Sequence, residues 1–167
     1  MFKQAGQFIV FLYALTNISI SSCWAGDDSP LVITPIPGKA VCKSSSGAIK
    51  DISIKSELCV TQGSFSHDVY VLKINGKPVL KGIDDETTKG ISSTFQNQKI
   101  NLTCSPQHKA PNEVSQEKIE ATQKAVPNLS FEEARKMAIM METVETGRLC
   151  IASSGENPFM TVQVNFE

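Results

Sequence analysis

The chain is poor in aromatic side chains and carries no surplus of positive charge. Phe, Trp and Tyr make up 7% of its 167 residues, and the formal net charge is −1. Surfaces that stack on sugars or bases need aromatic rings, and binding to nucleic acid or anionic lipid needs a surplus of Lys and Arg. The composition therefore argues against a nucleic-acid partner. The apolar fraction of 41% is sufficient for the core of one domain.

Sequence motifs that carry catalysis or bind metals are missing. There is no G-x-S-x-G, S-x-x-K or C-x-x-C motif and no glycine-rich phosphate loop. A catalytic pair of His67 with Asp68 is disfavoured, because adjacent residues at the start of a strand point to opposite faces. The acidic run Asp84 to Glu86 lacks the spacing of a calcium-binding loop. These absences predict that the protein is not an enzyme and has no cofactor, metal or small-molecule substrate.

The first 25 residues have the pattern of a secretory signal peptide. Lys3 supplies a positive start, Phe8 to Ile20 is an uncharged apolar run, and Cys23 and Ala25 occupy the positions that a signal peptidase reads. The apolar run is too short for a transmembrane helix. We therefore expect cleavage after Ala25 and export to the periplasm. Alternatively, Ile20 to Cys23 fits a bacterial lipobox, and a lipid on Cys23 would then anchor the protein to a membrane.

Four cysteines remain in the exported chain. Cleavage at the predicted position removes Cys23 and leaves Cys42, Cys59, Cys104 and Cys150. An even number of cysteines in an oxidising compartment predicts two disulfides, and the spacings match no zinc motif. Of the three pairings that four cysteines allow, we expect Cys42–Cys59 and Cys104–Cys150, since each joins neighbouring segments.

The first half of the exported chain predicts antiparallel strands. Residues 26–38 hold three prolines and are expected to form an extended arm. A hairpin is predicted over Asp68 to Ile83, because Asn75-Gly76 can adopt the positive φ values that a type I′ turn needs. Ahead of it we expect an edge strand at Leu31 to Thr34, strands at Ala40 to Lys43 and at 49–60, and a turn at Ser44 to Gly47.

After this hairpin, turn and strand signals alternate again. Asp84 to Lys89 is expected to be a polar loop that ends at Gly90. A second hairpin is predicted to join Ile91 to Phe95 with Lys99 to Cys104, across a turn at residues 96–98. Ser105 to Pro111 contains two prolines and is expected to break the strand.

Two helices and a last hairpin complete the predicted fold. The first helix is expected over residues 113–125, with Val114, Ala121 and Ala125 on its apolar stripe. The second begins with a capping box at Ser130 and Glu133, buries Ala134, Met137, Ala138, Met141 and Val144, and ends at Gly147. Strands at Arg148 to Ala152 and Met160 to Phe166 follow. The fold class is therefore α+β, a mainly antiparallel sheet in one domain over residues 39–167, with two helices inserted before the last hairpin.

Several of these features together resemble a known group of proteins. The signal peptide, the four cysteines, the segment Tyr70 to Val79 and the loop Gly82 to Gly90 look like small periplasmic inhibitors of cell-wall-degrading enzymes. This group includes immunity proteins against type VI secretion amidase effectors, and bacterial lysozyme inhibitors. The inhibitory motif of the membrane-bound lysozyme inhibitors is not evident here, which favours immunity. The resemblance implies a protein partner, a peptidoglycan hydrolase, whose active site is occluded.

Two polar segments beside hairpins are the candidates for this contact. Their serine hydroxyls are able to hydrogen-bond a catalytic Cys–His pair. The candidate residues are Asp84, Asp85, Glu86, Thr87, Thr88, Lys89, Ser92 and Ser93 in the first segment, and Ser153, Ser154, Gly155 and Glu156 in the second. The alternatives are an enzyme that uses Asp84, Asp85 or His67, and a structural lipoprotein of the cell envelope anchored at Cys23.

Overall fold

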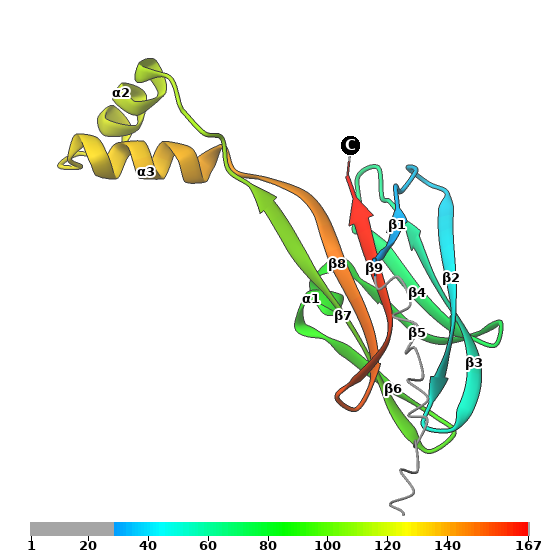
Figure 1. The fold of residues 1–167 in the computed structure, drawn as a ribbon. Coiled ribbons are helices and arrows are strands. Elements are labelled where there is room, and N and C mark those ends of the chain that lie inside the picture. Colours follow the sequence, from blue (N-terminus) through cyan, green and yellow to red (C-terminus); the bar gives the residue numbers. More distant parts are fainter. Residues whose placement is uncertain (1–28, 167) are drawn as a thin grey trace, which may run out of the picture.

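Two mainly antiparallel sheets pack face to face in the computed structural model, which describes residues 29–166 (Figure 1). The predicted signal peptide and Cys23 lie outside these residues. The five-stranded sheet has the order β1-β9-β8-β7-β6, with β1 at Leu31–Ile33, β6 at Ile91–Phe95, β7 at Gln98–Lys109, β8 at Val144–Ser154 and β9 at Asn157–Asn165. The four-stranded sheet has the order β2-β3-β4-β5, with β2 at Ala40–Ile49, β3 at Ile52–Thr61, β4 at Val69–Ile74 and β5 at Lys77–Ile83.

Within residues 29–166, three helices complete the fold, which is α+β as predicted. Helix α1 (Asp84–Lys89) links the two sheets, while α2 (Gln116–Ala125) and α3 (Phe131–Met141) lie between β7 and β8, before the last hairpin. The edge strand expected near Leu31 is confirmed as β1, which pairs in parallel with β9. In the described part of the chain, no helix is long and apolar enough to span a membrane.

The core lies between the sheets and follows the two-residue period of the strands. Tyr70, Leu72 and Ile74 are fully buried on β4, and Ile100 and Leu102 face them from β7, within one apolar cluster. Successive strand residues point to opposite faces, so the intervening residues lie on the outside of the sandwich.

Both predicted disulfides are present. Cys42 on β2 lies directly opposite Cys59 on β3, and Cys104 on β7 lies opposite Cys150 on β8. Cys104 and Cys150 are buried in the core cluster. Cys59 lies between two core residues of β3, so its side chain points to the outer face of the sheet. Its partner Cys42 is exposed on that face. One disulfide therefore links two strands inside the core, and the other links two strands on an outer face.

The turns after β4 and β6 each consist of two residues with positive φ. Asn75 (φ 51°) and Gly76 (φ 78°) connect β4 to β5, which confirms the predicted hairpin. The turn between β6 and β7 is shorter than predicted. It consists of Gln96 and Asn97 alone, both with positive φ, and Gln98 already pairs with Phe95.

The predicted turn at Ser44 to Gly47 is wrong. These residues continue β2, where Ser44 pairs with Glu57 and Gly47 with Ile54. As an edge strand, β2 tolerates small residues of low strand propensity, because only one of its sides must match a neighbour. The chain instead reverses at Lys50, which has positive φ, so the predicted strand 49–60 begins at Ile52.

The break predicted at Ser105 to Pro111 is also wrong. Strand β7 runs on to Lys109, and Pro106 pairs with Arg148 of β8. Strand β6 pairs with β7 only as far as Leu102, so β7 has a single neighbour at Pro106. Proline is compatible with that position because it lacks only one backbone donor on an otherwise open edge.

The helices differ from the prediction mainly at their ends. The capping box is confirmed, since Ser130 Oγ accepts from Glu133 N at 3.3 Å and Glu133 Oε2 accepts from Ser130 N at 2.9 Å. However, α3 ends at Met141, and Val144 and Gly147 belong to β8. A Cβ atom at Gly147 would lie 2.2 Å from Val164 O, so this glycine permits close strand approach and does not end the helix.

The predicted buried faces of the two helices are only partly correct. Ala134 and Ala138 are buried as expected, but 74% of Met141 is exposed. Helix α2 buries Ile119 and Thr122 in place of the predicted stripe. The two helices pack on each other and project away from the sandwich, so no sheet covers the rest of their apolar faces (Figure 1).

Candidate functional site

The loop between β3 and β4, which we call the Phe65 loop (residues 62–68), carries a fully exposed phenylalanine. Its two ends are held, since Gly38 N donates to Gln62 O at 2.9 Å and Gly63 N donates to Asp68 Oδ1 at 3.0 Å. A Cβ at Gly63 would lie 2.2 Å from Ser66 O, so only glycine fits this tight turn. A held loop thus presents one large apolar ring to solvent.

Helix α1 lies beside this loop and replaces the polar loop predicted at these residues. Its first turn is acidic, and Glu86 Oε2 accepts from Ile83 N at 3.0 Å. Acidic residues at a helix start, followed by Gly90 after Lys89, are the sequence signals for such a helix. Thr87 is fully buried. Of the candidate residues on α1, Thr87 therefore lies inside the protein, while Asp85, Glu86 and others remain on the surface.

Two hydrogen bonds join the Phe65 loop to α1. His67 Nδ1 lies 2.7 Å from Asp84 Oδ1, and Asp84 N donates to Asp68 O at 3.2 Å. His67 therefore pairs with a carboxylate on another element and not with the neighbouring Asp68. The bond engages Nδ1 and leaves the other ring nitrogen of this half-exposed imidazole available.

Arg148, on β8, connects α1 to the five-stranded sheet. Its guanidinium is nearly buried and forms two bonds to Glu145, with Nε–Oε1 at 2.6 Å and Nη2–Oε2 at 3.2 Å. Nη1 donates to Asp84 O at 2.9 Å and to Thr88 Oγ1 at 3.0 Å. A planar guanidinium that is bonded at both ends holds the helix in one orientation.

Asp68 closes the loop in a partly buried position. Burial raises the pKa of its carboxyl, and the charges of Asp84 and Glu145 act in the same direction. The Gly63 N–H and the positive charge of Arg148 act against this rise. The loop end is therefore held by an acid that binds its proton more tightly than usual.

The second candidate segment lies at a distance from α1. Ser153 and Ser154 belong to β8, and Gly155-Glu156 form the turn to β9. Six residues separate Ser154 from Arg148 along β8, which corresponds to about 20 Å in a strand. The structure therefore does not bring this segment close to the α1 residues of the first segment.

Ser92 and Lys89 belong to a different surface from the Phe65 loop. They line a shallow hollow with Lys99 and Asn101. Asn101 pairs with Ser92 on one side and with Ser153 on the other, so these three side chains share the outer face of the five-stranded sheet. Ser93 has the opposite orientation on β6.

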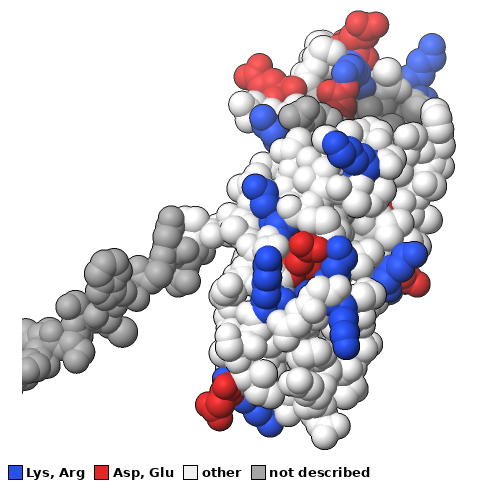
Figure 2. Space-filling model, turned by 90° about the vertical axis from the view of Figure 1, so that its right-hand side faces the viewer, with Lys and Arg blue, Asp and Glu red and all other residues white. Residues whose placement is uncertain are grey.

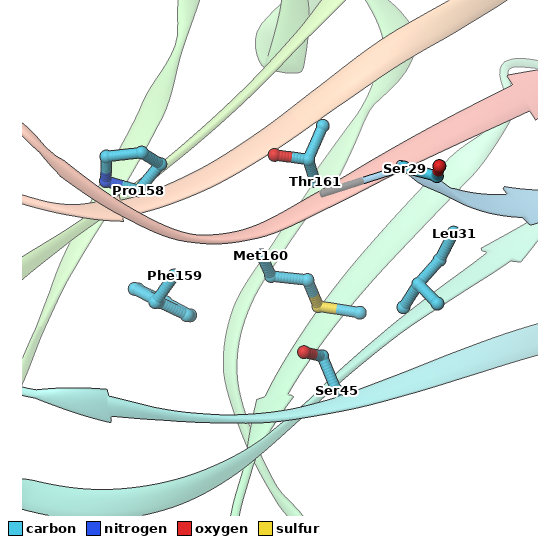
Figure 3. Close-up of a pocket in the computed structure, with 7 residues that line it drawn as sticks. All are labelled: Ser29, Leu31, Ser45, Pro158, Phe159, Met160 and Thr161. Atoms are coloured by element: carbon cyan, nitrogen blue, oxygen red, sulfur yellow. The ribbon is translucent and has the colours of Figure 1, made fainter. Parts of the chain in front are cut away.

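A separate hollow lies between the edge of β2 and the strands β1 and β9. Figure 3 shows Ser45 on β2 facing Met160 and Leu31, with Phe159 and Thr161 beside them. The volume is about 450 Å³ and the hollow is open to solvent. Its lining consists of apolar groups and hydroxyls, which suits a contact with a chain segment better than acid–base chemistry.

Lysines gather on the outer face of the four-stranded sheet, the face shown in Figure 2. Lys55, Lys73 and Lys81 lie on the outward positions of β3, β4 and β5, around the single carboxylate of Glu57. Lys73 Nζ bonds Glu57 Oε1 at 2.7 Å, which lowers the pKa of this carboxyl. A chain of almost balanced charge therefore has one basic face.

Among the described residues, one group whose ligand atoms are not in a disulfide has the close spacing that metal binding requires. The ligand atoms of His67, Asp84 and Asp85 lie within 4.8 Å of one another. Asp84 Oδ1 already accepts hydrogen bonds from the His67 side and from Asp85 N, which an ion would have to replace. Cys42, Glu57 and Cys59 also lie close together, but both sulfur atoms are in a disulfide.

No known protein family, characterised protein or solved structure matches this chain. The site is therefore interpreted from its own geometry. Sequence reasoning singled out the residues of α1, as a polar loop, but missed Phe65, since a single aromatic in a glycine- and serine-rich segment has no periodicity. Its one signal was its setting: a large apolar residue between Ser64 and Ser66, where no strand or helix would bury it.

Proposed function

We propose that the protein is an exported inhibitor that binds a peptidoglycan hydrolase and occludes its active site with the Phe65 loop and the first turn of α1. The observation that carries this proposal is the fully exposed Phe65 on a loop whose ends are held by backbone hydrogen bonds. Large exposed aromatic side chains are the usual energetic centre of protein interfaces.

The surroundings of Phe65 support insertion into a cleft. The two disulfides and the bonds of Arg148 restrict the scaffold before binding, which lowers the entropy cost of ordering the loop. Beside the ring, His67 and Asp84 offer polar atoms that are able to bond catalytic groups of the target. The sequence resemblance is the reason for proposing an amidase as the target. The proposal also includes the role of immunity protein against a type VI secretion effector.

The test is inhibition of a purified cell-wall amidase, compared between the oxidised parent protein and the Phe65→Ala variant. Truncation of an interface centre weakens binding by about 2–4 kcal/mol, so the inhibition constant should rise about 30- to 1000-fold. The melting temperature should not change, because Phe65 contributes nothing to the core.

The matched control is Phe131→Ala, which removes the same ring from a partly exposed position on α3. This variant should inhibit like the parent protein. If Phe65→Ala inhibits as well as the parent, the loop is not the inhibitory element. If no cell-wall hydrolase binds the parent protein, the inhibitor function itself is wrong.

A hydrolase is the second candidate function, and one observation favours it. The bond from His67 Nδ1 to Asp84 resembles the base-and-orienter pair of a catalytic triad, and Ser64 and Ser66 line the same hollow. The hollow is wide open to solvent, whereas enzyme active sites usually shield the reacting groups from bulk water. Hydrolysis of an activated ester that is lost in His67→Ala would support this function over inhibition.

A further inference from the structure

Helices α2 and α3 form a helical arm (residues 110–143) that stands clear of the sandwich. Figure 1 shows the arm carried on the extended ends of β7 and β8, far from both sheet faces. The two helices pack on each other, and neither packs extensively on a strand. The arm is therefore an outlying element that the core of the domain does not hold in place.

The interior of this arm is small. Only Ile119 and Thr122 on α2 and Ala134 and Ala138 on α3 are buried within the two helices. Helices of 10 and 11 residues are marginal in water, and helix pairs gain most of their stability from apolar packing. The arm thus lacks the core that would keep it folded without a further contact.

Apolar side chains that would supply such a core are exposed on α3. Met140 is 68% exposed and Met141 74% exposed, and a shallow apolar groove is lined by Leu129, Met137 and Met140. Residues 137, 140 and 141 have the spacing of one helix face. Methionine is flexible and polarisable, which suits it to pack against another helix.

The charges on the arm match a second copy of the same arm. Each helix contains two acidic and two basic residues, and on α3 Glu132 and Glu133 precede Arg135 and Lys136. Because these four residues lie within the first half of α3, two copies of α3 that run antiparallel can place Glu133 of each against Lys136 of the other. Glu133 and Lys136 also border the methionine groove, where these ion pairs would form.

From these observations we infer that two copies of the protein associate through their helical arms, which pack antiparallel along the methionine face of α3 into a four-helix bundle. A two-fold axis makes the contact self-complementary, and a closed dimer results. This interface completes the core that each arm lacks. It is separate from the Phe65 loop, so a dimer would present two copies of the proposed inhibitory surface.

The first experiment is sedimentation equilibrium of the oxidised parent protein and of Met140→Glu, from about 1 to 100 µM protein. The parent should dimerise with rising concentration, and Met140→Glu should weaken the dimer at least 100-fold with an unchanged melting temperature of the sandwich. The control is Ala121→Glu, which adds the same charge on the exposed side of α2. This control should dimerise like the parent.

A charge exchange tests the antiparallel arrangement. Lys136→Glu and Glu133→Lys should each weaken self-association about tenfold, and an equimolar mixture of the two variants should form a heterodimer. A parent protein that stays monomeric at 100 µM overturns the inference, as does a dimer that Met140→Glu leaves intact. Phe65→Ala should keep the dimer while losing inhibition, so the inference and the proposed function fail separately.

Discussion

At the scale of single residues, the site depends on a few side chains that bind across elements. Arg148 lies on β8 and reaches the backbone of Asp84, which in turn bonds His67 in the Phe65 loop. These three residues come from distant parts of the sequence. Their proximity follows from the packing of the two sheets, and no local sequence pattern predicts it.

Asp68 gives the loop a dependence on pH. Its pKa in the folded protein is raised above 3.8, so its contribution to stability is full below that pH and is lost as pH rises through the folded pKa. Asp68→Asn does not titrate and keeps an oxygen for the Gly63 N–H. The free energy of unfolding of this variant, relative to the parent, should therefore increase from about pH 3.5 to pH 7.

Urea denaturation at intervals of about one pH unit measures this difference. The expected gain is small because Asp68 is only partly buried. Asn101→Asp, which places a carboxylate on the outer sheet face, serves as a control for the general effect of charge. A difference for Asp68→Asn that stays constant over the whole range would contradict the prediction.

Sequence reasoning succeeded for residues whose role is local and failed for those whose role depends on packing. Asn75-Gly76 forms the predicted turn because the required φ values are a property of these residue types. The capping box at Ser130 is similarly local. Thr87 was expected at the surface and is buried, because the fold places α1 over β7.

At the scale of elements, the sequence predicts which segments are strands better than it predicts where they end. Strands β2 and β7 run through serines and a proline that read as breaks, because pairing with a long neighbour outweighs local propensity. Strand β8 begins at Val144. The sequence predicts its start four residues later, at Arg148, because the helical periodicity of the sequence continues through Val144. The helical arm was predicted as two helices, but its direction away from the sheets was not.

Removal of the arm tests whether the sandwich is independent of it. Lys109 pairs with Val144, so Asn-Gly in place of residues 110–143 would join β7 and β8 by a two-residue turn. The core cluster contains no arm residue, and the melting temperature should therefore remain within about 5 °C of the parent value. Differential scanning calorimetry of the oxidised protein measures this, and a much lower value would show that the arm supports the sandwich.

At the scale of the whole molecule, the two disulfides differ in surroundings and in the length of chain that they close. Cys42–Cys59 spans 17 residues on an outer face, and Cys104–Cys150 spans 46 residues in the core. Chain-entropy estimates give about 3 kcal/mol for the shorter loop and about 4 kcal/mol for the longer one. The sequence predicts which cysteines pair. It does not predict that only one of the two disulfides is buried, because burial depends on strand register.

Mild reduction should therefore break the disulfides in order. A thiol reductant without denaturant reaches the exposed Cys42 first, whereas the buried Cys104–Cys150 bond should open only on unfolding. Alkylation followed by mass spectrometry identifies the cysteines that are free at each time. Simultaneous reduction of both bonds in the folded protein would contradict the expected order.

The parallel pairing of β1 with β9 joins the first and last strands of the described chain. In the exported protein that we propose, the polypeptide would cross the membrane with β1 ahead of β9, so β1 would remain without its partner strand until β9 follows. The five-stranded sheet is thus completed only when translocation is nearly finished. A chain truncated before β9 would leave β1 without its neighbour in the sheet, and the five-stranded sheet would stay incomplete.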